Sequence, residues 1–140
     1  MTTGLNATVL AVLPQHHWLQ SARLIENTWE AVEAVCENVE DILEPEDFEG
    51  EPMWFSACVP IQWEKPSPGK RETPEEWNER LGSLRSMPPQ DIAPIILFMD
   101  AAGELKIVDG YHRIALSIER GCGSISALIR YCQVESKKCR

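Results

Sequence analysis

Hydrophobic and polar positions along the chain predict several short strands that alternate with amphipathic helices. Runs with the length and the apolar content of buried strands cover 7–13, 53–63, 92–100, 105–109 and 124–131. Pro14 ends the first run, and Pro60 interrupts the second. The short turn AAGE separates 92–100 from 105–109, so we expect these two strands to form a hairpin.

The longest helix is predicted over 21–43. Its apolar stripe recurs at steps of three and four and consists of Ile25, Trp29, Val32, Cys36, Val39 and Leu43. Ser21 can cap its start, and Pro45 follows its end. Glutamates occupy its other faces. The pattern favours an acidic surface helix packed on the core, with a dimerising helix as the alternative.

Two further helices have clear boundary signals. Thr73, Pro74 and Glu76 combine an N-cap residue, a first-turn proline and the acidic partner of a capping box, which predicts a helix from there to about Arg85. A second helix is predicted over 112–120. Gly121 follows it, in the position that favours left-handed backbone geometry.

The composition fits one soluble domain. The chain has 140 residues and is 44% hydrophobic, enough for one core. It has no run of about 18 apolar residues, so no membrane helix is expected. The N-terminus also lacks the pattern of a signal peptide, which favours the cytoplasm. The five cysteines form no CxxC motif, and their odd number argues against a zinc site or a disulfide framework.

The charge is distributed unevenly. The net charge is −9, but residues 1–64 hold 12 acidic side chains and one basic, whereas residues 65–140 hold 12 basic and 10 acidic. The acidic half is a poor candidate for binding a polyanion such as DNA. It serves solubility, or it contacts a basic protein partner through the helix at 21–43. The second half can hold a small anion locally.

The chemistry concentrates at the sequence Asp109-Gly110-Tyr111-His112-Arg113, where a strand leads directly into a helix. The first turn of a helix has free backbone N–H groups and the positive end of the helix dipole, which together favour a phosphate. Gly110 has no Cβ to keep a ligand away from the backbone. Arg113 offers a planar fork for phosphate oxygens, and His112 can donate a hydrogen bond or move a proton.

Each of these residues also has an ordinary structural interpretation. Asp109 can cap the helix, although it can also reach a ribose hydroxyl or a metal ion. Gly110 can be a turn residue, and His112 a packed side chain. Arg113 can pair with a carboxylate elsewhere in the chain. Their order at one corner is the reason to consider a phosphate site.

The segment 94–129 resembles the ParB/sulfiredoxin superfamily. The signature of that superfamily is a strand, a Gly-x-His-Arg or Gly-x-Arg-Arg box, a helix, a glycine and a closing strand. Here the box is Gly110-Tyr111-His112-Arg113, and Ile125-Ser126-Ala127 belongs to the closing strand. The upstream segment 59–68 resembles the strand and proline-rich loop of sulfiredoxins, and Lys65 matches a basic residue that touches nucleotide phosphate there. Ser83 and Ser86 lie near the hydroxyl positions of the preceding helix.

The resemblance covers about 57–131. It implies a small α+β domain, with a mixed sheet and flanking helices, that binds ATP, ADP or CTP, often with Mg²⁺. We therefore expect this domain over 53–132, preceded by an N-terminal strand and acidic helix in 1–52 and followed by a polar tail in 133–140. The phosphate-binding residues implied are Lys65, Asp109, Gly110, Tyr111, His112 and Arg113.

Two departures from the superfamily narrow the chemistry. Sulfiredoxin chemistry needs a cysteine between the glycine and the histidine of the box, where this chain has Tyr111, and Cys122 lies beyond the far end of the predicted helix. The partition proteins have two arginines in the box and a DNA-binding domain after it. Here His112 takes the first arginine position, and only nine residues follow Tyr131.

The Asp-Gly-x-His-Arg form is similar to that of ADP-dependent free-serine kinases and of ParB-like proteins with ATPase or nuclease activity. Phosphoryl transfer requires a group that positions or deprotonates the attacking hydroxyl. Glu64, beside Lys65, is the candidate for this role together with His112. A solvated loop carboxylate is the ordinary interpretation of Glu64.

Three hypotheses follow from the sequence. The first is a nucleotide-binding enzyme that transfers or hydrolyses a phosphoryl group. The second is a non-enzymatic interaction module, such as an inhibitor or antitoxin-like protein, that uses the acidic half. The third is a metal-dependent ParB-like nuclease, which the negative charge disfavours because DNA is a polyanion.

Overall fold

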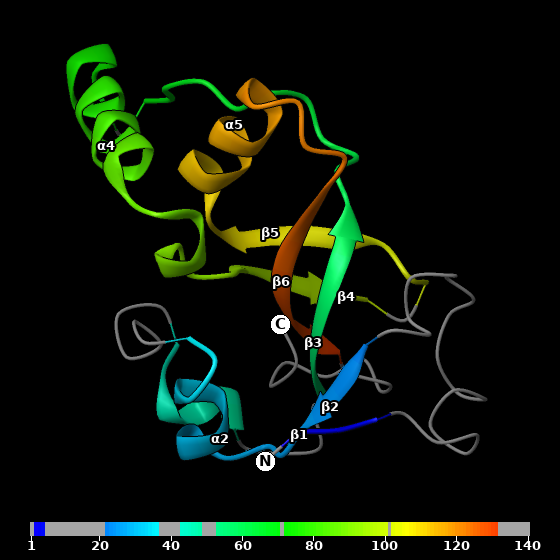
Figure 1. Ribbon diagram of the computed structural model, residues 1–140. Helices are drawn as coiled ribbons and strands as arrows, with labels where there is room; N and C mark the ends of the chain where they lie inside the picture. Colours follow the sequence, from blue (N-terminus) through cyan, green and yellow to red (C-terminus); the bar gives the residue numbers. More distant parts are fainter. Residues whose placement is uncertain are drawn as a thin grey trace.

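One twisted β-sheet with helices on both faces forms the framework of the chain (Figure 1). The computed structural model describes residues 2–4, 22–36, 43–48, 53–70, 72–100 and 102–131. Within them the sheet has six strands in the order β1-β2-β3-β6-β4-β5. The strands are β1 (Thr2–Gly4), β2 (Arg23–Ile25), β3 (Met53–Pro60), β4 (Ile95–Met99), β5 (Leu105–Asp109) and β6 (Ser124–Tyr131). The chain is therefore an α+β domain, as expected.

The sheet is mixed because one neighbouring pair is parallel. β4 runs parallel to β6, whereas the other neighbours run antiparallel. The two longest strands, β3 and β6, pair along their whole length, from Met53 opposite Tyr131 to Pro60 opposite Ser124. A parallel pair requires a connection that crosses back along the sheet. Here β5 and the helix after it provide that connection, and they place the Asp-Gly corner at one side of the sheet.

Alternating side chains of the central strands divide the core between the two faces of the sheet. Phe55, Ala57 and Val59 of β3 join the cluster that contains Ile114 of the helix after β5. Trp54, the residue before Phe55, joins the opposite cluster with Val32 and Cys36. This inward and outward alternation is the expected pattern for a strand with a helix-covered face on each side.

The helices are α2 (Trp29–Glu33), α4 (Pro74–Ser86) and α5 (Tyr111–Glu119), with short 3₁₀ turns at Pro45–Phe48 and Pro89–Asp91. α4 and α5 lie together on one side of the sheet, and α2 lies on the other (Figure 1). The main contact of α4 is with α5. It packs on α5 through Trp77 and Leu81, which contact Ala115 and Leu116.

The predicted helix over 21–43 is wrong. Residues 23–25 form β2, which pairs with β3 in the register Leu24 opposite Phe55, and among the described residues of this range only Trp29–Glu33 are helical. Thr28 caps this short helix by accepting a hydrogen bond from the Ala31 amide at 3.2 Å. The apolar stripe did mark buried positions such as Ile25 and Val32. Hydrogen bonding to β3 overrides the helical pattern at its start, since local propensity is weak against tertiary contacts.

Most of the other predicted elements from residue 53 onward are confirmed. β4 and β5 pair antiparallel as the expected hairpin. β6 covers 124–131, and Gly121 has the left-handed φ of 74°. The predicted strands 53–63 and 92–100 are shorter than expected, at Met53–Pro60 and Ile95–Met99. The predicted strand 7–13, residues 37–42 of the predicted helix and the tail 133–140 lie outside the described residues. Among the described helices, none has the length and apolar character needed to cross a membrane.

The capping box of α4 gives a first prediction. The Thr73 hydroxyl accepts from the Glu76 amide at 3.1 Å, and the Glu76 carboxylate accepts from the Thr73 amide at 3.0 Å. We expect Thr73→Ala to lower the free energy of unfolding by about 1 kcal/mol, because one helix N–H loses its acceptor. Urea denaturation measures this. Thr73→Ser keeps the hydroxyl and should restore most of the loss; equal losses in both variants would contradict the capping role.

The same capping box predicts a pH dependence. The hydrogen bond from the Thr73 backbone, followed by that with its side chain, lowers the pKa of Glu76. A lowered folded-state pKa stabilises the fold above the ordinary glutamate pKa, and this contribution is lost as the pH falls through the folded-state pKa. The stability difference between wild type and Glu76→Gln should therefore shrink as urea titrations move from pH 7 to pH 3. Glu75→Gln in the same turn is the control, and a difference that does not depend on pH would contradict the prediction.

Candidate functional site

The corner between β5 and α5 depends on an unusual backbone geometry at Gly110. This residue is the N-cap of α5, with φ 117° and ψ 22°, in the left-handed region. A Cβ at this position would lie 2.5 Å from Cγ2 and 2.8 Å from Cβ of Ile95 on β4. The missing Cβ therefore allows β4 to pack closely against the corner. The expectation that the missing Cβ also lets a ligand approach the backbone stays a prediction.

The first turn of α5 presents its backbone N–H groups at this corner. The first hydrogen bond inside the helix runs from the Ile114 amide to the Gly110 carbonyl, at 2.9 Å. The amides of Tyr111, His112 and Arg113 therefore have no acceptor within the helix. Gly110 contributes no side-chain cap to them. These unpaired donors are the feature for which the sequence predicts a phosphate at this corner, and that site stays a prediction.

Arg113 is used mainly to hold the corner together. Its guanidinium donates to the Asp109 carboxylate at 2.6 Å and to the carbonyl oxygens of Ala93 and Pro94. Only 15% of its side chain is exposed. Asp109 is therefore the ion-pair partner of Arg113, and the expected helix cap by Asp109 is wrong. The expected phosphate fork of Arg113 is largely occupied by acceptors of the protein itself.

His112 is held by two contacts from the neighbouring helix region. Its Nε2 atom lies 2.9 Å from Oε1 of Glu72, the residue before the N-cap of α4. Its ring packs on Trp77, with 4.3 Å between ring centroids and 34° between ring planes. A carboxylate only accepts hydrogen bonds, so the Nε2 atom of a neutral His112 carries the proton. The imidazole thus has a fixed position.

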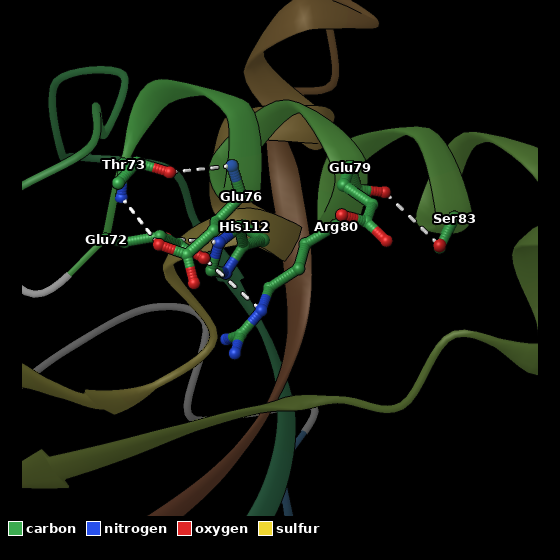
Figure 2. Close-up of polar contacts among 7 residues, drawn as sticks. All are labelled: Glu72, Thr73, Glu76, Glu79, Arg80, Ser83 and His112. Carbon is green, nitrogen blue, oxygen red and sulfur yellow. Dashed lines mark hydrogen bonds and ion pairs between the residues drawn. The ribbon is translucent and has the colours of Figure 1, made fainter.

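Glu72 also faces Arg80 (Figure 2). Its second oxygen, Oε2, lies 3.3 Å from Nε of Arg80, which is close enough for an ion pair. The two groups are not aligned for a hydrogen bond, so this buried oxygen has no hydrogen-bond partner among the described residues. Arg80 is 69% exposed, whereas Glu72 is 14% exposed. Glu72 therefore links a partly buried histidine to an exposed surface arginine.

Two cavities meet at His112. A cavity of about 320 Å³, which we call the corner cavity, is lined by Arg80 and Ser83 of α4 and by Asp109, Gly110, His112 and Arg113. A second cavity of about 550 Å³, which we call the loop cavity, is lined by Gly69, Lys70 and Glu72 of the loop and by Trp77, Tyr111 and His112. His112 is the residue common to both.

The structure does not bring Glu64 and Lys65 to this corner. The Lys65 ammonium lies 3.7 Å from Oε1 of Glu119 at the other end of α5, eight residues after Tyr111 and about 12 Å along a helix. Glu64, beside it, is exposed and lines neither cavity. Arg85 donates two hydrogen bonds to Glu119. These bonds are the main reason that the pKa of the Glu119 carboxyl is lowered.

Of the remaining predicted residues, Tyr111 begins α5 and is 47% exposed on the wall of the loop cavity. Ser83 lines the corner cavity, and its hydroxyl donates to the Glu79 carbonyl at 3.2 Å (Figure 2). Ser86 makes the equivalent bond to Gly82 without lining that cavity. The described residues contain no group of three or more side chains arranged to hold a metal ion.

Sequence reasoning missed Glu72, Trp77 and Arg80. Arg80 and Ser83 are three residues apart on α4, which places them on one face of the helix, so the helix prediction held a partial signal. Nothing in the local sequence indicated that this face meets the start of α5. No family model, curated protein or solved structure matches the chain.

The contact between Gly110 and Ile95 gives a prediction. Gly110→Ala should lower the free energy of unfolding by about 2–5 kcal/mol, because it combines left-handed strain with a steric clash. Gly82→Ala is the matched control. Gly82 lies inside α4 with open space around it, so alanine there should raise stability by about 0.5–1 kcal/mol. Urea denaturation of both variants measures the two changes, and a neutral Gly110→Ala would contradict the described corner.

Proposed function

We propose that the corner cavity binds the phosphate groups of a nucleotide, and that the protein acts in phosphoryl transfer or nucleotide hydrolysis. The observation that carries the proposal is the position of Arg80 and Ser83 of α4 across from the first turn of α5. Free helix N–H groups and a guanidinium converge on one cavity, and this combination of donors suits a phosphate.

Arg80 is the cation best placed to contact the ligand. It is 69% exposed, and its only ion pair among the described residues is the non-hydrogen-bonded contact with Glu72. A weak surface pair of this kind contributes at most about 1 kcal/mol, so a phosphate can compete for the guanidinium. Arg113, by contrast, is held by three acceptors and maintains the shape of the corner.

The size of the corner cavity supports phosphate groups in particular. Its volume of about 320 Å³ is at the small end of ligand sites, which commonly span about 300–1,000 Å³. This volume suits a phosphate chain, with the nucleoside extending beyond it. ATP, ADP and CTP are the nucleotides to compare, because the sequence resemblance implies this group. The proposed contacts in the corner cavity are to phosphate groups, so they do not distinguish one base from another.

Magnesium fits the site as an ion that enters with the nucleotide. Mg²⁺ is usually held by one or two carboxylates together with substrate phosphates. Asp109 is 46% exposed in its side chain and lines the corner cavity, so it supplies such a carboxylate beside its bond to Arg113. The ion would neutralise charge on the phosphate oxygens.

A second candidate function is a protein-interaction module that uses the acidic N-terminal half. Glu26, Glu30 and Glu33 are all exposed around α2, on the opposite side of the sheet from the corner. This surface is formed by a strand end and a short helix, rather than by one long helix. Its charge suits a basic partner.

Calorimetric titration with ATP, ADP and CTP in the presence of Mg²⁺ tests the nucleotide site. We expect Arg80→Ala to weaken binding by about 10- to 100-fold, because a hydrogen bond to a charged group contributes about 1.5–3 kcal/mol. Arg85→Ala is the matched control, since Arg85 lies on the same helix but pairs with Glu119 away from the corner cavity. Binding should also weaken with added salt, as phosphate contacts do.

Failure of the wild-type protein to bind all three nucleotides would overturn the proposed function. Equal effects of Arg80→Ala and Arg85→Ala would place the nucleotide elsewhere. If no nucleotide binds, charge reversal at Glu30 and Glu33 tests the interaction module. That hypothesis predicts that the variant no longer binds a basic partner while the corner remains folded.

A further inference from the structure

The contact between Glu72 and His112 is not needed to bind phosphate, so it requires its own explanation. Two kinds of donor at the corner, the helix amides and the Arg80 guanidinium, already suit an anion. Glu72 adds negative charge beside His112, which disfavours an anion nearby. One of its oxygens is also buried without a hydrogen bond, at a free-energy cost. The only charged group beside that oxygen among the described residues is Arg80, at 3.3 Å, so the burial of Glu72 requires an explanation.

We propose that His112 is the proton acceptor for the attacking hydroxyl in phosphoryl transfer, and that Glu72 is the residue that positions it. This inference rests on the proposed nucleotide site and deepens it. Glu72 Oε1 holds the Nε2–H of the imidazole at 2.9 Å. The other ring nitrogen, Nδ1, then carries the lone pair. Among the described residues no side chain or backbone group bonds to Nδ1, which is therefore available to a ligand.

The ring is prevented from turning away by its second contact. Trp77 is 7% exposed and packs on the imidazole at 4.3 Å between centroids. Trp77 itself is fixed by the interface with Ala115 of α5. A fixed ring, a defined tautomer and an oriented carboxylate are the features by which a histidine becomes an effective base.

The two cavities give the reactants separate approaches to the same imidazole. The phosphates occupy the corner cavity, and the attacking hydroxyl approaches through the loop cavity, which also exposes His112. The loop cavity has a volume of about 550 Å³ and is large enough for water or for a small alcohol. Its wall contains Tyr111 in the place where a sulfiredoxin would have its reactive cysteine.

In the hydrolytic form of the reaction, a water oxygen forms a bond to the terminal phosphorus while its proton moves to Nδ1 of His112. The bond between that phosphorus and the bridging oxygen breaks, and the leaving nucleotide keeps the electron pair. The imidazolium lies between Glu72 and the phosphates until it returns the proton to the released phosphate or to solvent. With an alcohol in place of water, the same steps transfer the phosphoryl group.

Steady-state hydrolysis of the Mg²⁺ complex of the nucleotide that binds most tightly tests the inference. Glu72→Gln should lower kcat by about 100-fold or more, as expected when general-base catalysis is lost, while the nucleotide Kd changes less than about threefold. His112→Ala should lose turnover, and added imidazole should restore part of it. Glu75→Gln, an exposed carboxylate change on the first turn of α4, is the control and should leave kcat unchanged.

Nitrogen NMR of the histidine ring provides a readout that does not depend on turnover. The wild-type protein should show the Nε2-protonated tautomer of neutral His112, and Glu72→Gln should shift the population toward the other tautomer, because an amide no longer requires a donor opposite it. Circular dichroism confirms that the variants remain folded. An Nδ1-protonated tautomer in the wild type would overturn the inference.

The outcomes separate the two proposals. If no nucleotide binds, the proposed function fails and this inference fails with it. If a nucleotide binds but the wild type neither hydrolyses nor transfers it, or if Glu72→Gln leaves kcat unchanged, the phosphate site stands and the role of Glu72 and His112 is wrong.

Discussion

The close approach of β4 to the start of α5 is the constraint on which the rest of the site depends. Gly110 allows it by having no Cβ where Ile95 packs, and Arg113 secures it by bonding the carbonyls of Ala93 and Pro94 just before β4. Asp109 completes the network from the end of β5. Three segments are thereby joined at one point. The direction of α5, and with it the orientation of its free N–H groups, follows from this junction.

The packing of α4 on α5 adds the side chains that give the corner its chemistry. Trp77 and Leu81 pack against Ala115 and Leu116, and this apolar contact sets the position of α4 relative to the corner. The capping box fixes where α4 begins, so Glu72 arrives immediately before it, beside His112. Arg80 and Ser83 follow on the same helix and close the corner cavity. The packing of α4 on α5 and the capping box of α4 thus place several polar side chains around the N-terminus of α5.

Two residues for which the superfamily resemblance implies phosphate binding have structural roles here. Arg113 serves the fold, and Lys65 contributes to a surface network with Glu119 and Arg85 at the far end of α5. The exposed guanidinium that lines the corner cavity belongs instead to Arg80 of α4. The corner therefore has the local sequence expected of a phosphate site, while Arg80 and Ser83, which lie outside the box, also line its cavity.

The sequence by itself determined the elements whose signals are local. The hairpin of β4 and β5, the capped start of α4, the helix after Gly110 and the last strand follow from turn residues, caps and apolar periodicity, each of which acts over a few neighbouring residues. Periodicity misled over 21–43, because residues 23–25 satisfy their backbone by pairing with β3, a partner about 30 residues away. The sequence also located the Asp-Gly-Tyr-His-Arg corner as the place to look for chemistry.

Only the tertiary structure decided which side chains meet there. Glu72 and His112 are 40 residues apart, and the contact between Arg113 and the carbonyl of Ala93 spans 20. Such contacts depend on how α4 packs on α5 and how closely β4 approaches the corner. The pattern of residues along the chain does not predict either contact. Packing depends on the complementary shapes of whole helices and strands, not on the spacing of residues within a single helix or strand.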